Sequence, residues 1–277
     1  MDTQLTTIYC LCDDLLHALE HSEDPQRQMS DAEVMTTALC AARFLKGNFA
    51  AARLFLKSHG YIPRMLSKGT FSARLHCLKE CFLLLFQVLG EVFKTREGAG
   101  LYLIDSFPIS VCDNIRIPRC RLYVSKETDD VFRGYTASKR RYFYGLKIHM
   151  LVTQDGLPVE AFLRPGSYSD TAELKNFAFD LPAGSTIYGD KAYNEYLTED
   201  LLQEASGITL LPLRKKNSKR GVEAFVEYVQ RYYRKAIETA GSALERLRPK
   251  SIHATSAAGF ELKVFLFVLA HSLSGVL

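Results

Sequence analysis

The chain has 277 residues, of which 47% are hydrophobic and 24% charged, and its formal net charge is +4. This composition is typical of a soluble globular protein with one large domain or two ordinary ones, and so mild a basic excess does not by itself indicate a partner. The N-terminal MDTQLTTIYC lacks the basic and apolar regions of a secretory signal, and the longest apolar stretch, residues 81–93, is too short to span a bilayer. We therefore expect no membrane partner.

The chain up to about residue 94 has the apolar spacing of helices. Ser30 and Glu33 form a capping-box pattern ahead of one helix, and residues 68–89 predict another, with Thr70 or Ser72 as its cap. The segment TREGAG after this region contains two glycines and predicts a boundary. We expect a helical N-terminal module over residues 1–95 and a second domain over 96–277.

The seven cysteines are an odd number scattered along the chain, which favours reduced thiols and a cytoplasmic location. Cys10, Cys12, His17 and His21 lie close enough in sequence to suggest a metal site. Their spacing fits no common zinc pattern, so the alternative that they are buried helix residues is preferred.

After residue 100 strands and helices alternate. LYLIDSFPI predicts a strand, and two further strands flank the turn signal Asp155-Gly156. Residues 169–181 are expected to be helical, with Asp170 and Glu173 as a capping pair. A strand ending at Asp190, a helix capped by Asn194, the strand ITLLPL and two final helices follow. This order predicts a mixed α/β domain with antiparallel and parallel strand pairs.

Two aspartates stand at unusual positions in these strands. Asp105 interrupts an apolar strand, where an unpaired charge costs several kcal/mol, and Asp190 follows Gly189 directly. Each can be a turn or cap residue instead. At the ends of two central strands, however, they would lie side by side as an oxygen-rich site suited to Mg²⁺.

A third ligand for such a site should come from another element. The last long helix but one offers Glu238, which follows Arg234 by four residues and can equally form an exposed ion pair with it. Lys147 and His149 lie two apart on a strand and so share a face, which either approaches the site or belongs to ordinary packing. Asp170, at the start of a helix, is interpreted as a cap rather than a ligand.

Positive charge gathers in two segments. RKKNSKR, from Arg214 to Arg220, has five basic residues in seven, and residues 114–147 carry nine against three acids, with tyrosines interleaved. Either segment can be a solvated face. Beside a carboxylate site, they favour a polyanionic partner whose phosphates they would neutralise.

Five segments together carry a family resemblance: LIDSFPI, FRGYTASKRRYFYGLKIHM, IYGDKAYNEY, LPLRKKNSKR and RKAIET. In this order they resemble the bacterial insertion-sequence transposases with an Asp-Asp-Glu catalytic triad, and they are most similar to the insertion-sequence family numbered 982. The resemblance extends over nearly the whole chain, including SDAEVMTTALCAARF near the N-terminus.

The resemblance implies a ribonuclease-H-like mixed sheet flanked by helices, preceded by the all-helical module. It implies that Asp105, Asp190 and Glu238 are the catalytic, metal-binding triad, with two Mg²⁺ ions and Mn²⁺ as a possible substitute. The reaction would be cleavage at transposon ends and strand transfer of the freed 3′-hydroxyl into target DNA. The expected DNA contacts are Lys147, Lys191, Arg214, Lys215, Lys216, Lys219, Arg220, Arg231 and Arg234.

Two positions depart from the pattern of many relatives. Where these have a Tyr three residues before the Arg of the helix, this chain has Arg231, and where they have a Lys seven residues after the Glu, it has Glu245. The assignment of DNA contacts to this helix face is therefore weaker than that of the triad. The expected partner is double-stranded DNA, bound by a homodimer or higher multimer near the bacterial nucleoid.

Two other functions are compatible with the sequence. One is a metal-dependent nuclease of the same fold that cuts DNA without joining it. The other is a non-catalytic DNA-binding protein derived from a transposase. A strand-transfer assay distinguishes the first from a transposase, and the intact triad argues against the second.

Overall fold

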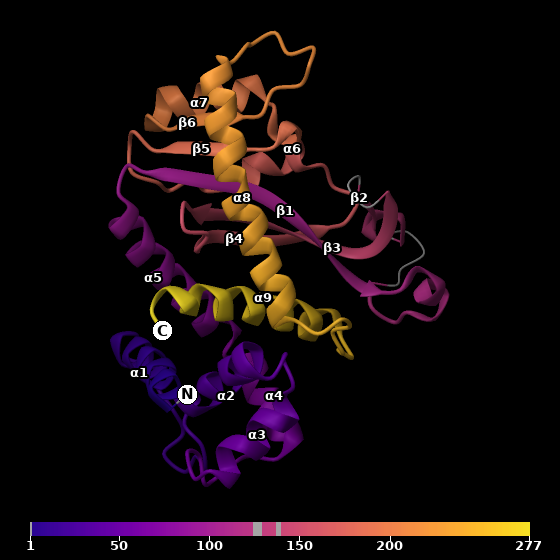
Figure 1. The fold of residues 1–277 in the computed structure, drawn as a ribbon. Coiled ribbons are helices and arrows are strands. Elements are labelled where there is room, and N and C mark those ends of the chain that lie inside the picture. Colours follow the sequence, from indigo (N-terminus) through magenta and orange to yellow (C-terminus); the bar gives the residue numbers. More distant parts are fainter. Residues whose placement is uncertain (1, 124–128, 137–139) are drawn as a thin grey trace. The chain divides into compact units, whose positions relative to one another are not determined.

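The computed structural model describes residues 2–123, 129–136 and 140–277 (Figure 1). The chain divides into two compact units. Unit 1 comprises residues 1–89 and 244–277, and unit 2 comprises residues 90–243. The divisions fall inside two long helices, α5 (Lys79–Glu97) and α8 (Ala224–Leu247). The C-terminal segment thus belongs to the same unit as the N-terminal helices.

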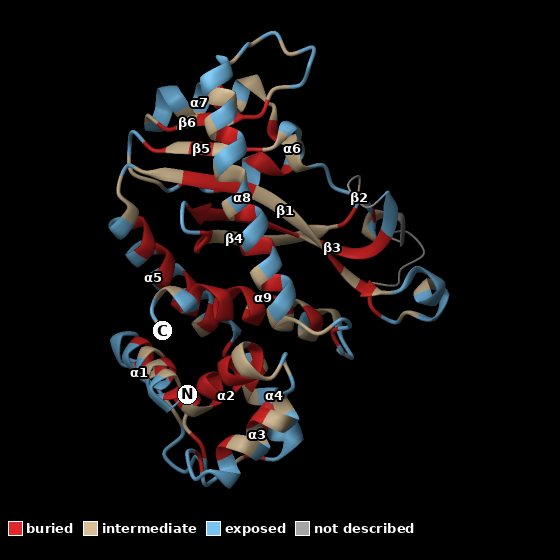
Figure 2. Ribbon diagram, in the orientation of Figure 1, coloured by how far each residue is buried: buried red, intermediate tan, exposed pale blue. Residues whose placement is uncertain are grey.

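Unit 1 is helical. It contains α1 (Asp2–Ala18), α2 (Asp31–Phe44), α3 (Phe49–Ser58), α4 (Lys68–Cys77) and α9 (Ala257–Ser272), together with the first part of α5. Helix α2 lies at the centre and contacts α1, α3, α4 and α9, and nearly all of its residues from Asp31 to Ala42 are buried (Figure 2).

The helix caps of unit 1 confirm one prediction and correct another. Ser30 caps α2, and the reciprocal bond from Glu33 completes the predicted capping box. The single helix expected over residues 68–89 is instead two, because α4 ends at Cys77 and α5 begins at Lys79. The cap of α4 is Ser67, whose hydroxyl accepts the Thr70 amide, and not Thr70 or Ser72. Ser67 is better placed to cap α4 than Thr70 or Ser72, because it directly precedes the first turn, whose backbone amides have no partner within the helix.

Among the described residues, one helix is long and apolar enough to cross a membrane by length and composition. It is residues 257–275, with a mean hydropathy of 1.4. Of this window, 61% is buried inside the protein, and α9 packs against α2. Such burial is characteristic of the core helix of a globular unit.

Unit 2 is built on one sheet, which within the described residues has six strands. They are β1 (Leu101–Cys112), β2 (Arg133–Thr136), β3 (Arg141–Thr153), β4 (Pro158–Pro165), β5 (Thr186–Gly189) and β6 (Thr209–Pro212). Strands β2, β3, β1, β5 and β6 are neighbours in that order, and β4 also pairs with β3. β1 is antiparallel to β3 and parallel to β5, which is parallel to β6. This mixed sheet with flanking helices is consistent with the predicted ribonuclease-H-like fold.

The connections of unit 2 differ from expectation in two places. Residues 169–181 form only a short helix, α6 (Asp170–Glu173), and a 3-10 turn (Leu174–Asn176), and the cap is Ser169 rather than Asp170 with Glu173. Helix α7 (Tyr196–Ser206) is capped by Glu195 and not by Asn194, and ends as predicted at Gly207, whose φ is +64°. Asn194 is occupied elsewhere, since its amide donates to the carbonyls of Lys191 and Leu213.

Three further 3-10 segments complete the described elements: Asn114–Arg119, Asp129–Phe132 and Lys191–Tyr193 in unit 2. A fourth, Leu273–Gly275, follows α9 in unit 1.

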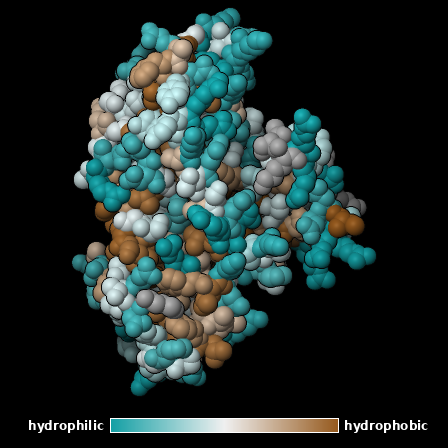
Figure 3. Space-filling view, viewed as in Figure 1, coloured by the Kyte–Doolittle hydropathy of each residue, from teal (hydrophilic) through white to brown (hydrophobic). Residues whose placement is uncertain are grey.

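Helix α8 packs closely on β1. A Cβ atom at Gly241 would lie 2.2 Å from the Phe107 ring, so only glycine permits this approach. Ile237 and Ala240 on the same helix are buried, whereas Arg231 and Glu238 are exposed. Figure 3 shows hydrophilic side chains along the middle of α8 on its outer side. The helix therefore places one face over the strand that carries Asp105 and leaves the other to solvent.

Candidate active site

Asp105 and Asp190 lie side by side at the centre of the sheet. In the parallel pair of β1 and β5, Ile104 is opposite Gly189. Asp105 directly follows Ile104, and Asp190 directly follows Gly189. Both line one small pocket, together with Tyr188, Gln230 and Arg234 among others. The register of two parallel strands thus brings together carboxylates that are far apart in sequence.

The two carboxylates are held by backbone amides. The Ser106 amide donates to Asp105 Oδ1 at 2.8 Å, and the Ala192 amide donates to Asp190 Oδ1 at 2.6 Å. Burial raises the pKa of Asp105 to about 7, and the neighbouring charge of Asp190 adds to this, whereas the Ser106 amide and Arg234 oppose it. The protein therefore compensates the negative charge of the pair only in part.

Glu238, the third predicted ligand, lies one helical turn after Arg234 on α8. Its carboxylate is 62% exposed and is 3.4 Å from Arg234 Nε, the ion pair that the sequence left open. Arg234 lines the pocket, and its charge lowers the pKa of Asp105. In the described part of the chain no three His, Cys, Asp or Glu side chains are grouped closely enough to hold a metal ion. Glu238 does not join the two aspartates in this structure.

The Asp105–Asp190 pair nevertheless suits a divalent cation. Its donors are carboxylate oxygens, the ligand type that Mg²⁺ prefers. The pocket of about 10 Å³ has room for a water-sized or ion-sized guest but not for an organic cofactor. A cation there would also relieve the incompletely compensated charge of Asp105.

Asp170, expected to be a cap, belongs to the surroundings of this pair. It accepts the Ser106 hydroxyl at 2.7 Å and Lys147 Nζ at 3.2 Å. Its charge also contributes to the raised pKa of Asp105. Lys147 donates in addition to the Tyr168 carbonyl at 2.9 Å, and its side chain is only 15% exposed. Lys147 is therefore paired inside the protein rather than free on the surface.

Two further polar side chains at the site were not predicted. The hydroxyl of Tyr193 is buried, and burial with the charges of Asp170, Asp105 and Asp190 raises the pKa of this tyrosine well above its usual value. Gln230 donates to the Leu211 carbonyl at 3.1 Å, while its buried Oε1 has no hydrogen-bond partner among the described residues. The sequence held one usable signal, since Gln230 lies one helical turn before Arg234 and so on the same face.

His149 has a different environment. It is fully buried and stacked on Phe162, with ring centroids 5.1 Å apart, and neither ring nitrogen has a hydrogen-bond partner among the described residues. Burial lowers its pKa to about 4. In the register of β1 and β3, His149 is opposite Ser106 and Met150 is opposite Asp105, so His149 and Asp105 point to opposite faces of the sheet. The histidine is a neutral packing residue.

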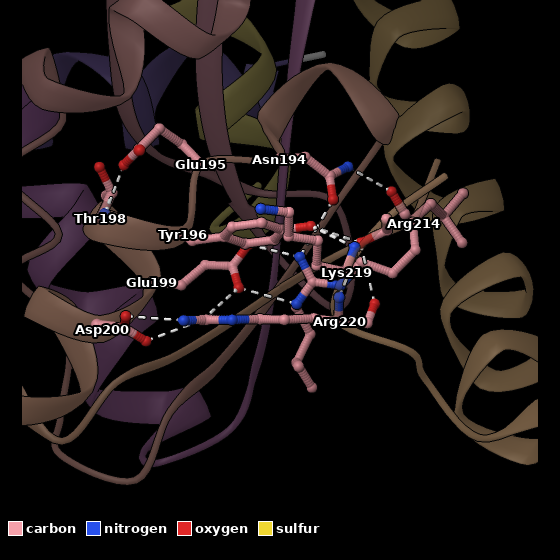
Figure 4. A network of polar contacts seen from close by, with 12 residues as sticks. Asn194, Glu195, Tyr196, Thr198, Glu199, Asp200, Arg214, Lys219 and Arg220 are labelled. Atoms are coloured by element: carbon pink, nitrogen blue, oxygen red, sulfur yellow. Dashed lines mark hydrogen bonds and ion pairs between the residues drawn. The ribbon is translucent and has the colours of Figure 1, made fainter. Parts of the chain in front are cut away.

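The basic segment RKKNSKR contains two paired arginines (Figure 4). Arg214 binds buried Glu199 through two bonds of 2.6 and 2.8 Å, and Arg220 binds Asp200 through two bonds of 2.8 Å. The Arg220 guanidinium also lies 4.7 Å from the centroid of the Tyr196 ring. Carboxylates of α7 therefore neutralise two of the five cations in this segment.

The remaining predicted DNA contacts are more accessible. Lys215, Lys216 and Lys219 are exposed in the same segment, and Lys191 is exposed directly after Asp190. Arg231 is 65% exposed and forms an ion pair with Glu227 at 2.5 Å on α8. Part of the other basic segment, residues 124–128 and 137–139, lies outside the described residues.

The cysteines and histidines of α1 do not form a metal site in the described residues. Cys12 is buried, and burial raises the pKa of its thiol to about 12, whereas Cys10 is exposed. His21 contacts Asp31 at 2.8 Å, and His17 contacts Asp13 at 3.4 Å. The expectation of buried helix residues holds for Cys12 only, because Cys10 and His17 are exposed on α1 and His21 follows the end of that helix.

The comparisons with known proteins bear on the same region. A family described as "Transposase DDE domain" matches residues 95–253, which contain Asp105, Asp190 and Glu238. No curated protein and no solved structure matches significantly. Because the family match covers more than half of the 277 residues and includes the whole carboxylate site, this chain belongs to the transposases with a DDE domain.

Proposed function

We propose that this protein is an insertion-sequence transposase that cleaves DNA at transposon ends and transfers the freed 3′-hydroxyl to target DNA. The observation that carries the proposal is the pair of aspartates on adjacent parallel strands, one of them with a strongly raised pKa, inside a domain that belongs to the DDE transposases. Membership in the insertion-sequence family numbered 982 is part of the proposal.

The triad Asp105, Asp190 and Glu238 would hold two divalent cations, Mg²⁺ or Mn²⁺. When bound, such ions supply Lewis-acid stabilisation of charge at phosphorus and an activated water or hydroxyl. Asp105 and Asp190 already share a pocket, whereas Glu238 has to leave its ion pair with Arg234 to reach it. Because the exposed pair is worth less than about 1 kcal/mol, this rearrangement costs little.

The remaining polar groups of the site position the reacting parts. Arg234, which lines the pocket, would attract a phosphate to it. The Lys147–Asp170–Ser106 network fixes the loop before α6 against β1, next to Asp105. Lys191, Lys215, Lys216 and Lys219 would contact the DNA backbone and give binding a strong salt dependence.

The division of labour follows the two units. We propose that unit 1 recognises transposon ends or mediates multimerisation, and that the DDE domain performs the chemistry in the bacterial cytoplasm. Within unit 1, residues 71–82 are a candidate recognition segment because Arg74, His76 and Lys79 are polar positions beside an apolar face, and the alternative is a core helix with ordinary surface charges. Arg74 instead binds Asp31 and the Met29 carbonyl, which leaves it less available to DNA.

The test uses the full chain, Mn²⁺ or Mg²⁺, and DNA that carries the terminal inverted repeats of its own element. Cleavage is followed with an uncut end, and joining with a pre-cleaved end and a target plasmid. We expect both products from the wild type and neither from Asp190→Asn, while Asp155→Asn, an exposed aspartate of the β3–β4 turn, serves as the matched control.

Three results would contradict the proposal in different ways. Cleaved but never joined DNA identifies a plain nuclease. DNA binding without either product identifies a non-catalytic derivative. Equal activity of Asp190→Asn and Asp155→Asn would show that the aspartate pair is not the catalytic centre.

A further inference from the structure

Unit 1 contains a large cavity that the proposed chemistry does not use. Its volume is about 500 Å³, within the range of about 300–1,000 Å³ typical of ligand pockets. It is lined by α3, α4 and the segment around the beginning of α9. All of these elements belong to unit 1.

The lining of this cavity is basic. It includes Arg53, Lys68, His76, His253 and Lys263, and within the described residues no Asp or Glu lines it. Burial lowers the pKa of Lys263, and the positive charge of Lys68 lowers it further. Like charges brought together without a counter-charge destabilise the free protein, so the cavity is prepared for an anion.

The cations are held at the wall of the cavity. Lys263 Nζ lies 5.1 Å from the centroid of the Phe49 ring and donates to the His253 carbonyl. The Arg53 guanidinium lies 5.7 Å from the centroid of the Phe71 ring and donates to the Leu66 carbonyl, and its buried Nε has no hydrogen-bond partner among the described residues. These contacts restrict both side chains and leave donors for a ligand.

The beginning of α9 adds to the positive potential. Ser256, its cap, and Gly259 of its first turn both line the cavity. The amides at the N-terminus of a 16-residue helix and its dipole favour a negative charge there. The cavity therefore combines fixed cations, two histidines and a helix N-terminus around one space.

We infer that this cavity binds a phosphodiester of the DNA backbone and so anchors DNA to unit 1. The inference rests on the proposed function for the identity of the polyanion, but its site is separate from the carboxylate pocket of unit 2. Its volume exceeds that needed for one phosphate and admits the attached sugar. Cations and a helix N-terminus are the groups that typically bind phosphate oxygens, which fits a contact that positions DNA on unit 1.

The experiment measures DNA binding by the full chain in EDTA at several salt concentrations. The test variant is Lys68→Gln/Lys263→Gln, and the matched control is Lys57→Gln, an exposed lysine of α3 that does not line the cavity. We expect the double variant to bind about tenfold more weakly and its log–log salt slope to fall by roughly 1, the value for one lost phosphate contact.

A third variant, Lys68→Arg/Lys263→Arg, keeps the charge and should restore the wild-type slope, which separates lost binding from lost folding. If the Gln variant retains the slope of Lys57→Gln, the inference is wrong. If millimolar inorganic phosphate raises the melting temperature of the wild type only, while the DNA slopes stay equal, the ligand is a free anion and not DNA. A wild type that neither cuts nor joins DNA refutes the proposed function. The salt slopes of DNA binding then still test whether the cavity binds DNA.

Discussion

Two charged clusters in unit 2 show how differently one chain uses similar residues. On α7, the carboxylates of Glu199 and Asp200 bind Arg214 and Arg220 through paired hydrogen bonds, so charges of both signs are matched (Figure 4). At the junction of β1 and β5, Asp105 and Asp190 are neighbours, and the pKa of Asp105 is raised to about 7. The matched cluster holds a loop in place, whereas the unmatched one is suited to bind a cation.

The difference arises from what each cluster faces. Bidentate arginine–carboxylate pairs neutralise the charges on both sides, so no further ion is required. In the aspartate pocket, two backbone amides and one arginine face two carboxylates, and Arg234 is shared with Glu238. We expect substitutions in the first cluster to change stability and substitutions in the second to change activity.

The largest expected effect is on activity, from Asp105→Asn. The amide keeps the shape of the side chain but removes its charge, so DNA cleavage should fall by at least roughly 10³-fold, or about 4 kcal/mol. The melting temperature should stay equal or rise, because an incompletely compensated charge is lost. Cleavage kinetics and thermal unfolding of the same preparation test this, with Asp155→Asn as control. If the variant loses activity only because a smaller fraction of it is folded, the aspartate pocket contributes to stability like the cluster on α7, and the comparison fails.

The second effect is on stability, from Glu199→Gln. Glu199 is 6% exposed and Arg214 12%, so the substitution removes the only charged partner of this largely buried guanidinium among the described residues, and leaves it the Asn194 Oδ1 acceptor. Breaking such a pair should lower the free energy of unfolding by about 3–4 kcal/mol. Denaturant unfolding measures the loss. Glu204→Gln, on the exposed side of the same helix, should change it by less than about 0.5 kcal/mol. If Glu199→Gln and Glu204→Gln lower the free energy of unfolding equally, the Glu199–Arg214 pair contributes no more to stability than an exposed glutamate does.

The third effect depends on pH and comes from His149. This buried histidine has no hydrogen-bond partner among the described residues and belongs to neither charged cluster. Its pKa in the folded protein is about 4, below the ordinary value of 6.5, so its stability contribution is present above pH 6.5 and lost as the pH falls through 4. The loss should reach about 3 kcal/mol. The nearby charges are Asp170, Lys147 and Arg164.

The measurement for His149 is the difference in unfolding free energy between the wild type and His149→Phe from pH 7 to pH 4. The phenylalanine fits the stacking against Phe162 and removes two buried nitrogens without partners among the described residues, so the variant should also be more stable at pH 7. If this difference in unfolding free energy does not grow as the pH falls, His149 takes up a proton as readily in the folded protein as in the unfolded one, and the prediction is wrong.

The smallest expected effect separates the two kinds of cation in RKKNSKR. Arg220→Gln should lower the unfolding free energy by less than about 1 kcal/mol, since this ion pair is partly exposed, and should leave the salt slope of DNA binding unchanged. Lys216→Gln should leave stability unchanged and reduce the slope by roughly 1. Denaturant unfolding and DNA titrations of both variants decide this. The reverse assignment of effects would show that the paired arginines contact DNA.

The sequence by itself determined the order and type of the main elements and the two aspartates. Strand composition around Asp105, the glycine before Asp190 and the helical spacing of about residues 222–247 are local signals, and the structure has an element at each. Local signals are reliable there because each element is defined by the burial of its own repeating apolar residues.

Only the tertiary structure decided which charges are paired. Asp170 faces Ser106 and Lys147 across 64 and 23 residues of sequence, and Arg214 faces Glu199 across 15. The packing of α9 against α2 and the basic cavity beside it likewise join the two ends of the chain. Such contacts depend on strand register and helix packing, which bring distant residues together without leaving a pattern in the neighbouring sequence.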